Sequence, residues 1–183
     1  GIIYYCKYPM NSNLSDEIFQ SHTHGELNIE EIIIHIKNFL EEVPDAEYSL
    51  VIGSDSHEKA DTKKDNGTKE ITLVTAILIH RKGFGGKYFW RRQYQNNIHS
   101  LREKIYAETI TSLTFASIFV PLFKKHLNGK AVNYNLEIHV DVGEHGDTRN
   151  MIKEVVGMVT GNGFVAKTKP DAYAASYVAD KHT

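Results

Sequence analysis

The sequence predicts a single α/β domain with a mixed central sheet, in which antiparallel and parallel strands are flanked by helices. Three observations predict this class. Two apolar strand patterns each end in an acid, at Asp55 and at Asp141. Between them, two further strand patterns flank the glycine-rich turn at 83–86, which is typical of an antiparallel meander. Helical patterns then alternate with the later strands, as they do in α/β proteins.

The composition is that of a soluble globular protein. Of the 183 residues, 41% are hydrophobic and 24% are charged, and no apolar run is long enough to suggest a membrane partner. Cys6 is the only cysteine, which excludes an intrachain disulfide and fits a reducing, cytoplasmic location. The net charge of −2 provides no general positive field. Binding to nucleic acid would therefore need a local basic patch.

Hydrophobic spacing and capping residues define the order of the elements. Asn28 and Glu31 have the spacing of a capping box, and the apolar stripe that follows them predicts a helix. Residues 1–25 are expected to be an N-terminal extension, and 26–183 one domain. The predicted elements are a helix from Asn28 to Leu40, strands at 48–55, 71–79 and 87–94, a helix at 101–126, a strand at 135–143, a helix from Thr148 to Gly161, a strand at 164–168 and a final helix at 172–182.

The longest helical pattern, over 101–126, carries an acid inside its apolar stripe. The stripe runs by steps of three and four through Ser112 and Phe119, and Glu108 falls within it. Burying an unpartnered polar group costs on the order of 2–7 kcal/mol, so the position of Glu108 favours a functional role. Pro121 is expected to kink or interrupt the helix near its end.

The two acids at strand ends could belong to one site if the fold brings their side chains together. Asp141 follows an alternating pattern at the carboxyl end of its strand, where open α/β sheets place their ligands. An acid at this position must be solvated, paired or bound to a cation. Asp55 follows Gly53 at the end of its own strand. Other carboxylates that meet Asp141 would therefore define a site.

The order of acidic residues resembles the ribonuclease H-like fold. Asp55 on a strand, Glu108 on the first long helix, Asp141 on a later strand and Asp180 on the last helix match the acids of that superfamily in order. Within it, the chain is most similar to the YkuK-like family, from about Ile18 to the C-terminus. The segments that carry this resemblance are Ile52-Gly-Ser-Asp-Ser56, His139-Val-Asp-Val-Gly143, Val155-Val-Gly-Met-Val159, Lys169-Pro170 and Ala174-Ala-Ser-Tyr-Val-Ala-Asp180.

The resemblance implies a metal-dependent nuclease that hydrolyses phosphodiester bonds in RNA, an RNA–DNA hybrid or structured DNA. Asp55, Glu108, Asp141 and Asp180 would hold two Mg²⁺ or Mn²⁺ ions, with Asp171 as the alternative to Asp180. Two ions about 3.5–4 Å apart can activate the attacking water and stabilise the leaving oxygen. Because like charges gather in such a site, at least one carboxylate should have a raised pKa.

Three histidines lie near the expected ligands. His57 and His145 each follow an acid by a few residues, and either could relay a proton to the leaving group or simply face water. We include His145 among the expected catalytic residues. His139 shares strand parity with Asp141 and is either a partner of the site or a core histidine with its hydrogen bonds satisfied.

A basic and aromatic hairpin is the expected nucleic-acid surface. Cations contact phosphates and exposed aromatic rings stack on bases, although strand alternation places some of these rings in the core. Lys167 and Lys169 could extend the surface near the site. The expected phosphate-binding residues are Arg81, Lys82, Lys87, Arg91 and Arg92.

Two other functions remain open from the sequence. The first is a nucleic-acid-binding module that keeps the fold without catalysis. The second and weaker one is an enzyme acting on nucleotides or another small phosphate ligand. The residues do not distinguish RNA from DNA, endonuclease from exonuclease action, or one oligomeric state from another.

Overall fold

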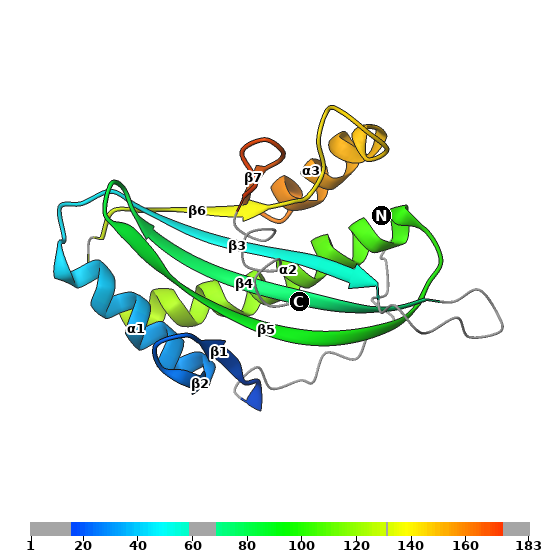
Figure 1. The fold of residues 1–183 in the computed structure, drawn as a ribbon. Coiled ribbons are helices and arrows are strands. Elements are labelled where there is room, and N and C mark those ends of the chain that lie inside the picture. The colour runs from blue at the N-terminus through cyan, green and yellow to red at the C-terminus, as the bar shows by residue number, and fades with distance from the viewer. Residues whose placement is uncertain (1–15, 59–68, 131, 174–183) are drawn as a thin grey trace.

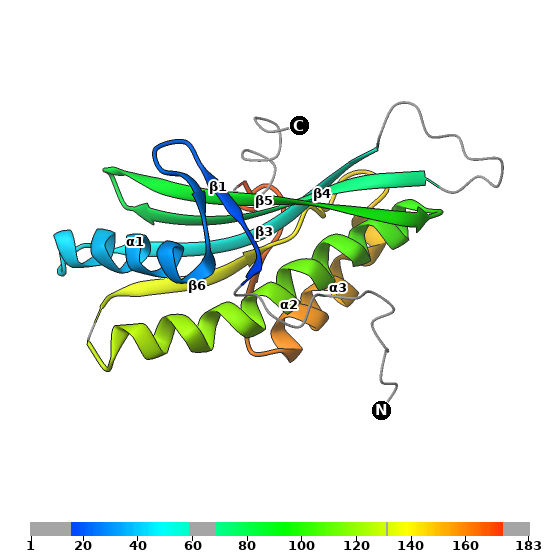
Figure 2. The ribbon, with the colours of Figure 1, turned by 90° about the horizontal axis from the view of Figure 1, so that it is seen from below.

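The computed structural model describes residues 16–58, 69–130 and 132–173, and these form a seven-stranded sheet in the order β2-β1-β5-β4-β3-β6-β7. The β3–β6 and β6–β7 pairs are parallel, and the β1–β2, β1–β5, β3–β4 and β4–β5 pairs are antiparallel. The predicted mixed α/β architecture is therefore confirmed. Figures 1 and 2 show α1 and α2 on the same face of the sheet. The elements are β1 (Phe19–Ser21), β2 (Gly25–Leu27), α1 (Ile29–Glu42), β3 (Tyr48–Glu58), β4 (Lys69–Arg81), β5 (Gly85–Ile98), α2 (Leu101–Leu127), β6 (Tyr134–His139), the 3₁₀ helix η2 (Arg149–Met151), α3 (Ile152–Gly161) and β7 (Val165–Lys167).

Helix α1 begins where its capping residues predict. The Asn28 side chain accepts a hydrogen bond from the Glu31 backbone N–H at 3.0 Å, and the Glu31 carboxylate accepts one from the Asn28 N–H at 2.8 Å. Two of the backbone donors that every helix start leaves free are thereby satisfied. The apolar stripe, which includes Ile32 and Ile36, is buried against the sheet.

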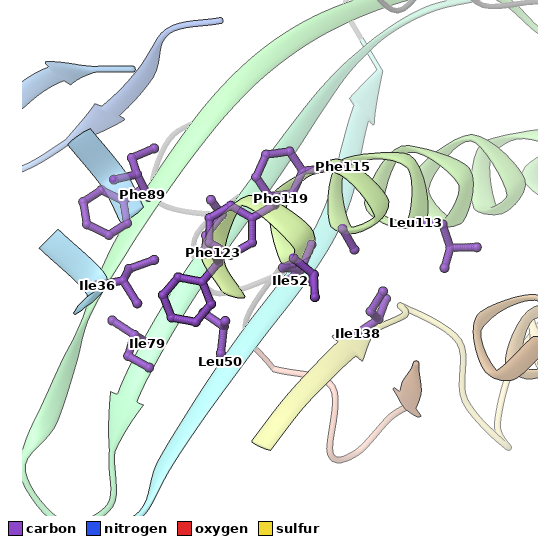
Figure 3. Close-up of a cluster of buried hydrophobic side chains, with 14 of the residues drawn as sticks. Ile36, Leu50, Ile52, Ile79, Phe89, Leu113, Phe115, Phe119, Phe123 and Ile138 are labelled. Atoms are coloured by element: carbon purple, nitrogen blue, oxygen red, sulfur yellow. The ribbon is translucent and has the colours of Figure 1, made fainter. Parts of the chain in front are cut away.

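Helix α2 forms the centre of the core and continues through Pro121, so the expected interruption there is wrong. The rings of Phe115, Phe119 and Phe123 stack along it, with centroids 5.4 and 5.6 Å apart, and are fully buried among side chains of α1 and the strands (Figure 3). This packing stabilises the helix on both sides of the proline. Although α2 is long and apolar enough to cross a membrane, its apolar side chains pack in the core of the α/β domain.

The register of the two central parallel strands places two acids side by side. Strand β3 pairs with β6 up to Gly53 and His139, where β6 ends, earlier than the expected end at residue 143. Asp55 and Asp141 each lie two residues beyond this last pair. They therefore occupy matching positions at the point where the two chains are no longer paired, as open α/β sheets favour for a ligand site.

A short hairpin before the expected domain boundary belongs to the sheet. Strands β1 and β2 pair with each other, and Gln20 of β1 pairs with Trp90 of β5. Phe19 is fully buried, with its ring centroid 5.4 Å from that of Phe115. The sheet thus starts before residue 26. The predicted helix at 172–182, including Asp180, lies almost entirely outside the described residues.

Candidate functional site

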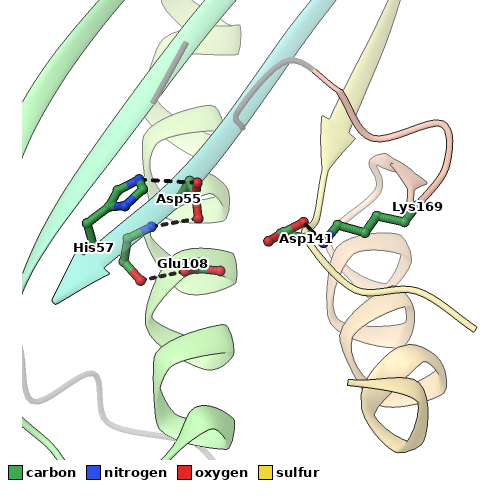
Figure 4. Close-up of polar contacts among 6 residues, drawn as sticks. Asp55, His57, Glu108, Asp141 and Lys169 are labelled. Carbon is green, nitrogen blue, oxygen red and sulfur yellow. Dashed lines mark hydrogen bonds and ion pairs between the residues drawn. The ribbon is translucent and has the colours of Figure 1, made fainter. Parts of the chain in front are cut away.

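Three acids from three different elements lie in the same region, beside the carboxyl end of β6. Asp55 comes from β3, Glu108 from α2 and Asp141 from the segment after β6 (Figure 4). Their charges act on one another: Asp141 helps to raise the pKa of Asp55, and both help to raise the pKa of Glu108. Residues far apart in the sequence are brought together here, which is the arrangement that the acid-ended strands suggested.

Glu108 is the most deeply buried of the three acids, with 2% of its surface exposed. Its Oε1 accepts a hydrogen bond from the Ser56 hydroxyl at 2.5 Å, and within the described residues its buried Oε2 has no hydrogen-bond partner. Burial is the main cause that raises the pKa of Glu108 to about 8, against the hydrogen bond from Ser56. Asp55 adds to this rise by repulsion, and Lys104 opposes it. Without a bound cation, Glu108 is therefore largely protonated at neutral pH.

Asp55 is also buried, with 8% of its surface exposed. Desolvation raises its pKa, the backbone N–H of Ser56 lowers it through a 2.8 Å hydrogen bond, and repulsion from Asp141 raises it again. Lys104, and His57 when it carries a proton, oppose the rise. His57 Nε2 lies 3.6 Å from Asp55 Oδ2, so this histidine is placed beside an expected ligand.

A row of buried hydroxyl groups joins α2 to the central strands below the acids. Ser112, one helical turn after Glu108, donates to the Ser54 hydroxyl at 2.9 Å, and Ser54 lies 3.1 Å from the Thr75 hydroxyl on β4. Ser54 and Ser56 share the helix-facing side of β3, since both bond to α2. These supporting residues were missed from sequence. The signal was two serines at alternate positions of an otherwise apolar strand.

A lysine enters the acid cluster from the segment after β7. Lys169 Nζ lies 2.7 Å from Asp141 Oδ1, and this contact raises the pKa of Lys169 (Figure 4). The charges of Asp55 and Glu108 raise it further. The predicted extension of basic residues toward the site thus includes Lys169, which contacts an acid directly.

The other two histidines have different surroundings. His139 is buried, its Nε2 lies 3.0 Å from a Glu137 carboxylate oxygen, and its ring contacts Tyr173 edge-on at 5.2 Å. Burial lowers the pKa of His139, and the description of a satisfied core histidine fits it best. His145 is exposed and lines a surface pocket with Glu144, Arg149, Ile152 and Lys153.

The two alternatives for a fourth acid are not resolved by the described residues. Asp171 is exposed and acts electrostatically on His139, and its backbone N–H bonds to the carbonyl of Thr168 at 2.8 Å. Asp180 lies outside the described residues. The fourth ligand therefore stays a prediction.

Arg91 does not belong to an exposed basic surface. It is 4% exposed, pairs with Glu17, and lies over the rings of Phe19 and Phe115, each 5.4 Å from the guanidinium carbon. Burial lowers its pKa to about 10, which still leaves it charged at neutral pH. Alternation along β5 turns Arg91 toward the helices, so it is a structural residue rather than part of the expected phosphate-binding set.

Three of the other expected phosphate-binding residues lie at the far end of the sheet. Arg81 pairs with Glu42 at 3.4 Å, Lys82 pairs with Glu47 at 2.8 Å, and Lys87 lies over the Phe39 ring. Because Arg81 lies opposite Tyr48, seven residues before Asp55 on β3, it is roughly 23 Å from the acids along the strand.

Among the five expected cations, Arg92 is the one that is both exposed and level with the acid cluster. It is exposed and lies opposite Val74, which in turn lies opposite Asp55. Residues directly opposite across antiparallel strands share a face of the sheet, so Arg92 and Asp55 are on one face, about 10 Å apart across the two strand spacings. Arg92 is therefore the member of the set best placed for a ligand at the acids.

The acid cluster fits a hard divalent cation in chemistry but is not arranged as a metal cage. Within residues 16–58, 69–130 and 132–173, no three His, Cys, Asp or Glu side chains lie close enough together to hold an ion as they stand. The donors are nevertheless all carboxylates, and Glu108 Oε2 is buried without a hydrogen-bond partner in this part of the chain. Mg²⁺ and Mn²⁺ prefer such oxygen donors.

An acid on a long central strand, a second on the long core helix and a third just after the parallel neighbouring strand define a ribonuclease H-like α/β protein. The Ribonuclease H-like family profile matches residues 31–183, and the chain belongs to that family. It is a YkuK-like member, because it is 30% identical over 180 residues to the "Uncharacterized protein YkuK" of Bacillus subtilis (strain 168), covering 91% of this chain and 96% of that relative. No solved structure gives a significant match.

Proposed function

We propose that this protein is a divalent-metal-dependent nuclease that hydrolyses phosphodiester bonds in RNA, an RNA–DNA hybrid or structured DNA. The observation that carries the proposal is Glu108, a buried carboxyl group whose raised pKa reflects burial and two neighbouring acids. Keeping an acid there destabilises the metal-free fold, and such groups cluster at functional sites. Membership of a ribonuclease H-like family supports a function related to nucleic acids.

The residues of the cluster have separate roles in this proposal. Asp55, Glu108 and Asp141 would hold the metal, with Asp180 as the proposed fourth ligand. Bound Mg²⁺ or Mn²⁺, as two ions, would lower the pKa of the attacking water and offset phosphate charge. The Ser56 hydroxyl fixes one oxygen of Glu108 and leaves the other available.

Two histidines are proposed to handle protons. His57 lies beside Asp55, within 3.6 Å of its carboxylate, where it can take or give a proton near the reacting phosphate. His145 lies on the exposed segment that follows Asp141, beside the basic side chains of Arg149 and Lys153. If the substrate extends from the acids to this segment, His145 can deliver a proton to a leaving oxygen.

Asp141→Asn tests the assignment directly. We expect wild-type protein to cleave labelled RNA, hybrid or branched DNA with Mg²⁺ or Mn²⁺, and the variant to lose at least about 100-fold in rate, since a ligand affects a metal site at least as much as its supporting partners do. The matched control is Asp147→Asn, an exposed acid on the same loop. Both variants should keep the wild-type circular dichroism spectrum. Equal cleavage by wild type and Asp141→Asn would rule out the proposal.

Arg92→Ala tests where the substrate backbone lies. We expect weaker nucleic-acid binding and a salt dependence reduced by about one phosphate contact, because Arg92 shares the face and level of Asp55. The control is Lys82→Ala, which removes a cation from the far end of the sheet. Fluorescence anisotropy at several salt concentrations measures both. If Lys82→Ala loses affinity and Arg92→Ala does not, the substrate binds at the turn end of the hairpin, near Lys82, and not beside the acids.

One observation favours a second function, a nucleic-acid-binding module without catalysis. Lys169 already offsets the charge of Asp141, and the three acids do not form a ready metal cage within the described residues. Such a module would bind nucleic acid in a salt-sensitive way and show no turnover with Mg²⁺, Mn²⁺ or another divalent ion. The cleavage assay above separates the two functions.

A further inference from the structure

Lys169 is placed so that its ammonium group neutralises the acid cluster from within. We propose that Lys169 is an internal counter-ion that competes with a divalent cation for these carboxylates, so that metal binding displaces its ammonium group from Asp141. This inference rests on the proposed metal site and adds to it a residue of this chain that sets metal affinity. Its test is a binding measurement and does not depend on cleavage.

The contact with Asp141 is direct. Lys169 Nζ lies 2.7 Å from Asp141 Oδ1, an oxygen that is almost inaccessible to solvent. The same ammonium interacts electrostatically with Asp55 and Glu108. A cation bound to that oxygen and an ammonium at the same oxygen repel each other, so the two cannot share it without loss of affinity.

The backbone around Lys169 is built to hold the side chain there. Its N–H donates to the carbonyl of Val142 at 2.8 Å, which joins the lysine to the segment that carries Asp141. Gly143 makes room for the side-chain stem, because a Cβ atom on Gly143 would lie only 3.0 Å from Lys169 Cβ. The lysine thus approaches the acids along a path that a larger residue at 143 would obstruct.

Lys167 supplies a matched comparison on the same segment. It lies two residues earlier, in β7, opposite His139 in the sheet, and its charge acts on His139. Replacing either lysine removes one positive charge from the same region of the molecule. Only Lys169 is paired with an acid of the cluster, counting the ion pairs among described residues.

Calorimetric titration with Mn²⁺ tests the competition in the wild type, Lys169→Met and Lys167→Met. Because the lysine is partly exposed, we expect Lys169→Met to bind Mn²⁺ roughly two- to fivefold more tightly than the wild type. Lys167→Met should match the wild type. The proposal is overturned if Lys169→Met binds Mn²⁺ no more tightly than the wild type, or if neither the wild type nor Lys169→Met binds Mn²⁺.

A second measurement uses the unaltered protein, in case Lys169→Met does not fold. Acetylation by an amine-reactive ester, followed by mass spectrometry, should label Lys169 faster when Mn²⁺ is present, while labelling of Lys167 stays constant. An unchanged rate at Lys169 at saturating Mn²⁺ contradicts displacement. If the wild type does not cleave but Lys169→Met binds Mn²⁺ more tightly, the nuclease proposal is rejected and the counter-ion proposal stands. If the wild type cleaves but Lys169→Met binds Mn²⁺ as the wild type does, the nuclease proposal stands and the counter-ion proposal is rejected.

Discussion

We expect Glu108→Gln to lower the proposed metal-dependent cleavage at least about 100-fold and, in the absence of metal, to make the protein more stable above neutral pH. The second effect follows from the pKa of Glu108, which folding raises from 4.5 to about 8. An acid with a raised folded-state pKa contributes stability that is complete below pH 4.5 and is lost as the pH rises through about 8. Glutamine does not titrate, so the variant lacks that loss.

Thermal unfolding in EDTA between pH 5 and pH 9 measures the effect. One pKa unit corresponds to about 1.4 kcal/mol, so the difference in pH dependence is on the order of 2–4 kcal/mol, or several degrees in Tm. The control is Glu144→Gln, an exposed acid that should retain the wild-type pH dependence. Asp55, whose pKa is also raised, leaves a smaller slope of the same sign in Glu108→Gln. Identical slopes in wild type and Glu108→Gln would contradict the buried, protonated acid.

In EDTA above neutral pH, Glu108→Gln should be more stable than the wild type. With Mg²⁺ added, the wild type should be the more stable of the two. A cation that binds only the folded state stabilises it according to its affinity, and Glu108→Gln offers one carboxylate fewer. The wild type therefore gains more from the ion than the variant does. This exchange of stability for a binding site is the usual relation between a buried charged group and its function.

We expect Glu17→Gln to destabilise the protein by about 3–5 kcal/mol, because it leaves the buried Arg91 guanidinium without its opposite charge. The adjacent rings of Phe19 and Phe115, which the guanidinium contacts, offset only part of that loss. Denaturation in urea measures the change. The double variant Glu17→Gln with Arg91→Met should recover most of the loss, since an apolar side chain of similar length can fill the position.

Binding of nucleic acid supplies the control for this pair. Arg91 faces the helices, so the folded fraction of Arg91→Met should bind RNA or DNA as tightly as the wild type does. If Arg91→Met is as stable as the wild type but binds nucleic acid more weakly, Arg91 contributes to the nucleic-acid-binding surface after all.

The sequence determined the parts of the fold that have a clear period. The apolar stripe of α1, the alternation in β3 and β4 and the capping pair Asn28–Glu31 are local signals, and local interactions set those elements. The acid cluster was also predictable, because matching positions after parallel strands meet at one end of a sheet.

The remaining features depend on contacts between distant residues. Strands β1 and β2 have three residues each, too few for a period, and exist because β1 meets β5. The continuity of α2 at Pro121 comes from packing on both sides of it, which outweighs local propensity. The burial of Arg91 depends on which face of β5 meets the helices. The position of Lys169 depends on the close approach of its segment to Gly143.

The distribution of strand lengths has a consequence for truncated forms of the protein. Among the described strands, the outermost ones, β2 and β7, have three residues each, whereas the long strands β3, β4 and β5 lie inside the sheet. Short edge strands leave few unpaired backbone N–H and C=O groups that another chain could pair with, and so limit self-association. A chain shortened to begin at residue 26 would lose β1 and leave β5, with its 14 residues, as the border. Such a fragment would be prone to aggregate, whatever its site retained.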